Sequence, residues 1–222
     1  MALILNEIET WIFDLDNTLY PADSDLFPQI SARMGSFIAQ RFALDGEAAR
    51  MLQKQLFRTH GTTLRGLMVE HGVDPHEFME FVHDIDLAAL APAEALSAAL
   101  ADLPGRKLVY TNGSRRHARR ILDHLGLARH FAGIFDIADA GFVPKPDPEG
   151  YRALIARFGI EPARAAMVED MAVNLAPAAA LGMVTVLVET GNDWAGAGGA
   201  ADWVEHRTGD LAVWLSSLSG CR

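Results

Sequence analysis

The chain has 222 residues, of which 50% are hydrophobic, so it can bury a substantial core and is not expected to be disordered. Its 19 basic and 29 acidic residues give a formal net charge of −10, which argues against a duplex-binding surface, since such a surface needs a basic stripe. We therefore expect no nucleic-acid polymer as a partner. The basic run at 115–120 is interpreted as the solvated face of a helix.

Cysteine content and hydropathy indicate the compartment. Cys221 is the single cysteine, so no internal disulfide can form, which fits a reducing environment. Residues 1–11 lack a positively charged start and are not expected to be a secretory signal. The longest apolar stretch, 172–188, is interrupted by asparagine, proline and glycine, and predicts a helix followed by a strand. We expect a cytoplasmic protein with no membrane partner.

Short apolar runs alternate with helical segments along most of the chain. The runs predicted to be strands are 11–13, 107–110, 134–137, 165–168, 184–188 and 203–204. Asp147-Pro148 is typical of a helix start, and Gly126, Gly159 and Gly182 are typical of helix ends. The alternation predicts an α/β fold with a parallel sheet. The glycine- and alanine-rich stretch 191–201 is interpreted as a flexible loop.

The interval 21–91 breaks this alternation, because it shows four helical patterns and no convincing strand. Three patterns are apolar faces, formed by Leu26, Ile30, Met34, Phe37 and Ile38, by Ala48, Met51, Leu52 and Leu56, and by Leu64, Leu67 and Met68. The fourth begins at Asp74, with Glu77 three residues later. We interpret 21–91 as a helical domain inserted after the first strand, with 1–20 and 92–222 as the α/β core. The insert should lie over the end of that strand.

Polar residues follow four of the predicted strands. The four groups are Asp14, Asp16 and Thr18; Thr111, Asn112, Gly113 and Ser114; Lys145; and Glu169, Asp170 and Asn174. Because the carboxyl ends of parallel strands share one edge of the sheet, we expect all four groups to meet there. Crowded carboxylates favour raised pKa values or a bound cation, and Mg²⁺ suits a few carboxylates beside a phosphate. The threonine, nearby amides and the lysine suit a phosphoryl group.

Taken singly, each group has an ordinary explanation such as a turn, a surface loop or a helix N-terminus. Their joint occurrence in this order is what favours a site. The sequence has no Gly-x-x-x-x-Gly-Lys-Ser/Thr loop and no Gly-x-Ser-x-Gly elbow, which argues against a P-loop nucleotide site and a serine hydrolase.

The four groups together resemble the motifs of the haloacid dehalogenase superfamily of phosphohydrolases. The resemblance implies a Rossmann-like α/β core with an inserted helical C1-type cap domain. It also implies that Asp14 attacks phosphorus and that Asp16 acts as general acid and base. Thr111, Asn112 and Lys145 would hold the phosphate, and Mg²⁺ would be bound by Asp14, Asp16 (through its carbonyl), Asp170 and Glu169, the last directly, through water or not at all.

A narrower resemblance is to the pyrimidine 5′-nucleotidase branch. It is carried by FDLDNTLYP at 13–21, HGTTLRGL at 60–67, FVHD at 81–84, and TNG at 111–113 followed by HA at 117–118. This implies a small-molecule partner, a nucleoside monophosphate such as UMP or CMP, with the protein a monomer or homodimer. In the cap, Thr62, Thr63 and Arg65 are candidates for substrate contact.

Other functions remain open at this point. They are a phosphatase for phosphoglycolate or a sugar phosphate, a phosphomutase, which the Glu169-Asp170 pair would also suit, and a catalytically silent binding protein on the same fold. The intact acidic and basic set argues against the silent protein, and Asp16 argues against halide removal. Among neighbouring residues, we expect Asn174 to support Asp170 and Lys145, Thr18 to secure its turn, and His117 to lie either on a helix surface or behind the site.

Overall fold

The structure is a computed structural model that describes residues 5–191 and 201–219. Most of the predicted loop at 191–201, and Cys221, therefore lie outside the described residues.

A six-stranded, fully parallel sheet forms the centre of the larger domain. Its strands are β1 (Thr10–Phe13), β2 (Arg106–Tyr110), β3 (Gly133–Phe135), β4 (Ala165–Glu169), β5 (Val184–Val188) and β6 (His206–Thr208). The spatial order is β3-β2-β1-β4-β5-β6, so β1 is a central strand. The chain adds β2 and β3 on one side of β1, and then returns to add β4, β5 and β6 on the other side, so the strand order reverses next to β1. Ligands bind at the carboxyl edge of such a reversal point. The predicted α/β parallel fold is confirmed.

Two predicted strands differ from the observed ones. The expected strand at 203–204 is instead a turn, where the Trp203 indole donates to the Ala172 carbonyl and the Thr185 hydroxyl donates to the Trp203 carbonyl. The edge strand is the polar β6, which pairs with β5 from Val186 to Val188. The third strand spans Gly133–Phe135 and not the predicted 134–137, because a turn begins at Ile137.

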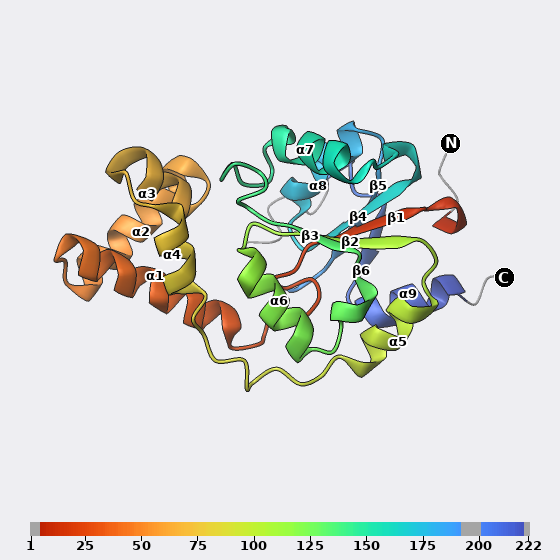
Figure 1. Cartoon of the computed structure of the whole chain (residues 1–222), viewed down its shortest axis with the longest axis horizontal. Coiled ribbons are helices and arrows are strands. Elements are labelled where there is room, and N and C mark those ends of the chain that lie inside the picture. Colours follow the sequence, from red (N-terminus) through yellow and green to blue (C-terminus); the bar gives the residue numbers. More distant parts are fainter. Residues whose placement is uncertain (1–4, 192–200, 220–222) are drawn as a thin grey trace.

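Helices cover both faces of the sheet. The α-helices are α1 (Leu26–Phe42), α2 (Gly46–His60), α3 (Thr63–His71), α4 (Pro75–Val82), α5 (Glu94–Asp102), α6 (Arg115–His124), α7 (Pro148–Phe158), α8 (Ala172–Ala180) and α9 (Leu211–Ser219). Short 3₁₀ turns lie at Leu5–Glu7, Ala128–His130 and Pro162–Arg164. In Figure 1, α7 and α8 lie on one side of the sheet and α5, α6 and α9 on the other.

The β1 side chains alternate between these two layers. Trp11 and Phe13 pack with α5, α6 and α9, whereas Ile12 packs with α7 and α8. Each face of the sheet therefore has its own apolar core, which leaves the strand ends as the place for polar groups.

Helices α1–α4 form the helical cap, which lies beyond the carboxyl ends of the strands (Figure 1). The cap has its own core, in which Phe37 packs edge-to-face on Phe78, and Ile137 from the larger domain joins it. The Asp74 carboxylate accepts from the His76 N–H and caps α4, as predicted. One predicted apolar contact is wrong, since Met51 is 67% exposed and Ala49 is buried in its place. The exact residue bounds of the two domains stay a prediction.

Within the described ranges, none of the helices combines the length and hydrophobicity needed to span a bilayer. The cytoplasmic location stays a prediction.

Candidate active site

Asp14 is the first residue after the central strand β1. Its N–H donates to the Val168 carbonyl at 2.9 Å, so the strand pairing continues up to the site. Asn17 adopts a left-handed conformation with φ of 61°, and the Thr18 hydroxyl lies 3.5 Å from Asp14 Oδ2. This turn places Asp14, a residue only 6% exposed, at the carboxyl edge of the sheet.

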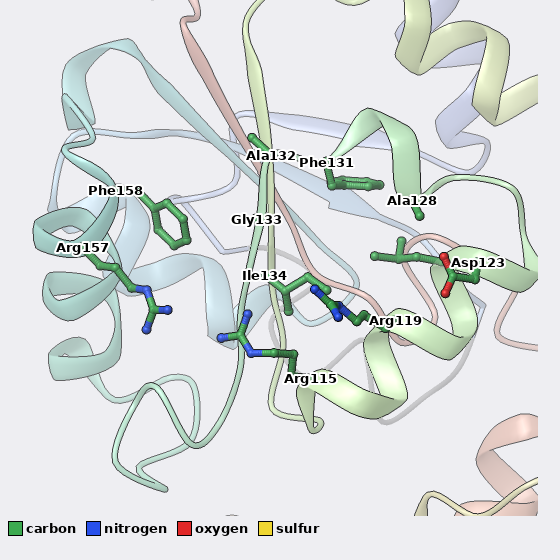
Figure 2. Close-up of a pocket in the computed structure, with 11 residues that line it drawn as sticks. Arg115, Arg119, Asp123, Ala128, Phe131, Ala132, Gly133, Ile134, Arg157 and Phe158 are labelled. Carbon is green, nitrogen blue, oxygen red and sulfur yellow. The ribbon is translucent and has the colours of Figure 1, made fainter.

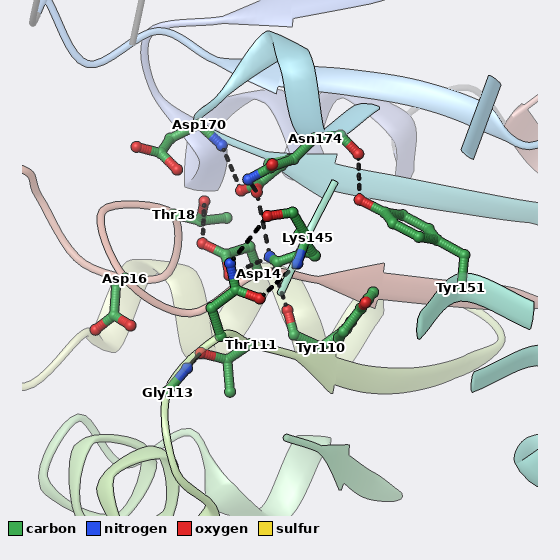
Figure 3. Close-up of polar contacts among 12 residues, drawn as sticks. Asp14, Asp16, Thr18, Tyr110, Thr111, Gly113, Lys145, Tyr151, Asp170 and Asn174 are labelled. Carbon is green, nitrogen blue, oxygen red and sulfur yellow. Dashed lines mark hydrogen bonds and ion pairs between the residues drawn. The ribbon is translucent and has the colours of Figure 1, made fainter. Parts of the chain in front are cut away.

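Lys145 contacts Asp14 although 131 positions separate them in the chain. Its Nζ donates to Asp14 Oδ1 at 2.7 Å and to the Tyr110 carbonyl at 3.1 Å (Figure 3). It also donates to Glu169 Oε1 at 3.1 Å. An ammonium has three donors, so all of them are used. Burial alone would lower the pKa of Lys145, but Asp14 and Glu169 raise it well above its usual value. The lysine is therefore a permanent positive charge inside the acidic cluster.

Glu169 connects this lysine to the end of β4. Its Oε1 also accepts from the Asn174 side-chain amide, and its Oε2 accepts from the Asp170 N–H at 3.0 Å. From the sequence we expect Asn174 to support Asp170 and Lys145 from behind the site. In the structure its amide, on α8, donates to Glu169, which in turn contacts both the Lys145 ammonium and the Asp170 N–H.

The acidic cluster fits a divalent cation. Carboxylate oxygens of Asp14, Glu169 and Asp170 lie within 4.8 Å of one another. Asp170 Oδ2 is buried and has no hydrogen-bond partner within the described chain, which is costly for a carboxylate unless a cation satisfies it. Burial and Asp14 raise the pKa of Asp170 to about 7, and burial and Glu169 raise that of Asp14 well above its ordinary value. Hard oxygen donors with excess negative charge are the set that Mg²⁺ prefers.

A residue after β2 forms hydrogen bonds with the backbone of the loop that carries Lys145. Asn112 Oδ1 accepts from the Lys145 N–H at 2.8 Å, and its Nδ2 donates to the Lys145 carbonyl at 3.4 Å. The buried Thr111 hydroxyl accepts from the Gly113 N–H at 2.9 Å. The Asn112 side chain thus bonds to the Lys145 backbone on both its oxygen and its nitrogen. The position of Asn112 in the sequence did not indicate this contact.

Asp16 lies beside this cluster with a different set of partners. Its Oδ1 accepts from the Tyr20 hydroxyl at 2.6 Å and pairs with His117 Nε2 at 3.0 Å. Burial alone would raise the pKa of Asp16, but His117 and Tyr20 outweigh it and lower the pKa to about 2. The substrate-free site therefore holds Asp16 as a carboxylate.

Tyr20 was not among the residues predicted for the site, and two locations were predicted for His117, on a helix surface or behind the site. The signal for Tyr20 is its spacing of four residues from Asp16, because the turn in which the Leu19 N–H donates to the Leu15 carbonyl at 3.0 Å brings Tyr20 back to Asp16. His117 is 1% exposed, so the surface alternative for it is wrong. The prediction of a solvated helix face holds for Arg116 and Arg119, which are exposed.

The cap-domain residues predicted to contact the substrate, Thr62, Thr63 and Arg65, lie at the N-terminal end of α3. They take no part in the contacts described above. Thr62 caps α3, since its hydroxyl accepts from the Arg65 N–H at 3.1 Å, and Thr63 is buried. Within the described residues, the Arg65 guanidinium has no hydrogen bond or ion pair. Of the three candidates, Arg65 is therefore the most available for a ligand, and the contact itself stays a prediction.

A separate pocket of about 610 Å³ opens beside the edge strand β3, between α6 and α7 (Figure 2). Its walls include Phe131, Phe158 and the guanidinium groups of Arg115, Arg119 and Arg157. Arg115 and Arg157 both pair with Asp139, so much of the positive charge is already neutralised. The carboxylate cluster is not part of this pocket.

The site thus combines a parallel α/β sheet, a helical cap and a lysine-paired aspartate at the end of the central strand. A family model for haloacid dehalogenase-like hydrolases matches residues 8–182. The chain belongs to that family.

Two curated proteins and one solved structure show the range of its relatives. Phosphate metabolism protein 8 of Saccharomyces cerevisiae is 26% identical over 195 residues, which cover 81% of this chain and 61% of the yeast protein, so the chain spans less than two thirds of that relative. A phosphoglycolate phosphatase of Rhodospirillum rubrum is 29% identical over 207 residues, covering 81% and 79%. The HAD phosphatase from Thermococcus onnurineus superposes with a TM-score of 0.66 at 18% identity, covering 96% and 99%, which shows the shared fold.

Proposed function

We propose that the protein is a Mg²⁺-dependent phosphomonoester hydrolase that acts through a phosphorylated Asp14. One observation carries the proposal. The Asp14 carboxylate, 2.7 Å from the Lys145 ammonium, lies with Asp170 and Glu169 oxygens at the carboxyl edge of the central strands. A nucleophile, a neutralising cation and a metal-type donor set occur there together.

Asp14 and Asp170 would hold the Mg²⁺ ion, together with the Asp16 carbonyl that the family resemblance implies. When bound, the ion supplies positive charge that keeps these acids ionised and offsets the charge of the phosphate. Both Glu169 oxygens already have hydrogen-bond partners. We therefore assign Glu169 the task of holding Lys145 in place.

The chemistry has two halves. An Asp14 oxygen attacks phosphorus, the bond from phosphorus to the leaving oxygen breaks, and Asp16 gives that oxygen a proton. Asp16 then takes a proton from water, the water oxygen attacks phosphorus, and the bond from phosphorus to the Asp14 oxygen breaks, which releases inorganic phosphate and restores the Asp14 carboxylate. The low pKa of Asp16 in the free site means that the residue is a carboxylate before substrate arrives. An arriving phosphate brings like charge, which raises this pKa toward the range needed for the first half.

Lys145 has no donor left for a phosphate oxygen while it contacts Asp14, Glu169 and the Tyr110 carbonyl. Its main task is therefore to neutralise Asp14. The Thr111 hydroxyl accepts one hydrogen bond and keeps its own O–H donor, which suits a non-bridging phosphate oxygen. Asn112 contributes by fixing the Lys145 loop.

For the substrate, we propose pyrimidine nucleoside 5′-monophosphates, UMP or CMP, on the strength of the motif resemblance. Phosphoglycolate is the second candidate, because a relative of 29% identity carries the name phosphoglycolate phosphatase. The test is phosphate release with Mg²⁺ from UMP, CMP, AMP, GMP, phosphoglycolate and sugar phosphates at equal concentration. Preference for UMP and CMP supports the nucleotidase. A phosphoglycolate or sugar-phosphate preference replaces it, and release from none of them contradicts the phosphatase itself.

A further inference from the structure

The two oxygens of the Asp16 carboxylate have different surroundings. Oδ1 receives both the Tyr20 hydroxyl and His117 Nε2. Oδ2 has no hydrogen-bond partner within the described chain, and a Cβ built on Gly113 would lie 3.6 Å from it. Oδ2 therefore faces the Thr111–Gly113 side of the site, where a phosphate ester would lie, while Oδ1 is held from behind.

His117 is buried, and its ring contacts Asp16 Oδ1 through Nε2. It is 1% exposed on α6, whose first turn is capped by the Ser114 hydroxyl accepting from the His117 N–H at 3.3 Å. A carboxylate only accepts, so Nε2 is the donor to Asp16. Nδ1 is buried with no partner in the part of the chain that is described, so the Asp16 bond is the imidazole's one directed polar contact there.

The cap holds the other side of the His117 ring. His83, directly after α4, stacks on it with ring centroids 4.1 Å apart and planes at 12°. His83 Nδ1 also lies 3.0 Å from the Ser114 hydroxyl. Arg120 fixes the backbone there, donating to the carbonyls of His83 at 2.8 Å and Ile85 at 2.9 Å. A residue of the cap thus packs directly against the residue that holds Asp16.

We propose that His117 is a positioning residue for proton transfer, which holds Asp16 Oδ1 so that Oδ2 exchanges the proton with the leaving group, and that His83 ties this arrangement to the cap. The inference rests on the proposed acid–base role of Asp16. Proton transfer needs hydrogen-bond reach, and a misplacement of about 1 Å can cost about 100-fold in rate. Neither histidine touches the reacting atoms in this assignment.

The test compares two esters of nearly identical shape, 4-nitrophenyl phosphate and phenyl phosphate, with Mg²⁺ present. Nitrophenolate leaves readily without a proton, whereas phenolate benefits from one, so the ratio of their kcat/KM values reports the acid. H117F keeps a ring against His83 and removes the donor. We expect it to lower kcat/KM for phenyl phosphate about 10-fold or more beyond the loss for 4-nitrophenyl phosphate. H117Q, whose amide nitrogen can replace Nε2, should recover most of that difference.

Three further variants complete the design. Y20F removes the second Oδ1 donor with little loss of packing, and should shift the ratio in the same direction even if H117F is poorly folded. H83A should also shift it, and an unchanged ratio in folded H83A overturns the tie to the cap. H124Q is the matched control, because His124 lies on the same helix and contacts the Leu90 carbonyl.

The outcomes distinguish a failure of the positioning role from a failure of the proposed phosphatase function. If the wild-type protein hydrolyses both esters and folded H117F and Y20F lose activity equally on the two, or H117Q recovers nothing, the positioning role is wrong and the phosphatase stands. If the wild-type protein hydrolyses neither these esters nor any of the metabolites tested above with Mg²⁺, the proposed function fails and the positioning role fails with it. Thermal unfolding of each variant shows which of them are folded.

Discussion

Lys145 and Asp14 form a buried ion pair, with Nζ 2.7 Å from Oδ1 and both side chains less than a tenth exposed. Because Nζ also contacts Glu169, one cation balances two buried acids. Removing one partner of a buried ion pair costs about 3–5 kcal/mol, since the remaining charge is left uncompensated. This ion pair therefore stabilises the fold and also favours the ionised form of Asp14, the proposed nucleophile.

K145M should lose both stability and activity. We expect the free energy of unfolding to fall by about 3–5 kcal/mol. Because the neutralising charge beside Asp14 is gone, kcat should fall at least about 100-fold. Urea unfolding and steady-state kinetics with saturating Mg²⁺ measure the two effects. K107M is the matched control, since Lys107 is a buried lysine that contacts the Leu103 and Gly105 carbonyls away from the site. Wild-type kcat in K145M would contradict the assigned role.

D14N should abolish turnover while the fold survives. The amide is a poor nucleophile, so kcat should drop by at least about 10⁴-fold. The substitution keeps the side-chain volume, and Lys145 keeps Glu169 as its counter-ion, so no buried charge is left uncompensated as it is in K145M. The circular dichroism should therefore stay that of the wild type, and the loss of unfolding free energy should be smaller than for K145M. Phosphate release by D14N at the parental rate would exclude a phosphorylated Asp14.

Chelation should remove activity, and Mg²⁺ should restore it. Mg²⁺ should also raise the unfolding temperature of the metal-free protein, since a ligand present at 100 times its Kd stabilises by about 2.7 kcal/mol. D170N should abolish or greatly weaken that shift, because it removes the carboxylate with the unpartnered Oδ2. Activity that survives thorough chelation would count against the metal assignment.

The metal-free protein should lose stability as the pH rises from about 4 to about 7. The pKa of Asp170 is raised from 3.8 to about 7 in the folded state, mainly by burial and by Asp14. The folded state therefore keeps the proton that the unfolded state has released, and the penalty grows until the folded group also ionises. At 1.36 kcal/mol per pKa unit, the loss is at most about 4 kcal/mol. Urea unfolding after chelation at pH 5 and pH 8 should show a smaller pH difference for D170N, and an equal difference would contradict this origin.

Arg65 and Thr62 should behave differently despite their proximity. R65A should raise KM for the preferred nucleotide with little change in kcat, since it removes a binding contact used equally before and during reaction. T62A should instead cost about 1 kcal/mol of stability, because the α3 cap is lost, and leave the substrate profile unchanged. Kinetics on UMP and 4-nitrophenyl phosphate, with thermal unfolding, distinguish the two. An unchanged KM in R65A would remove it as a substrate contact.

The sequence by itself determined the parallel sheet, the helical insert and the edge at which the acids meet. These follow from short-range patterns: apolar runs, helix end signals, and the rule that parallel strands bring their carboxyl ends together. Asp14, Lys145 and Asp170 could be placed at one edge because each lies just after a strand or on the loop that follows one.

Only the tertiary structure decided which side chains hold those acids. His117 and Asp16 are separated by 101 positions, and their contact depends on where α6 lies against the turn after β1. The same holds for His83, which reaches His117 through the packing of the cap, and for Asn174, whose partner is Glu169. Such pairs are set by the angle and register of packed helices, which no periodicity in the chain encodes.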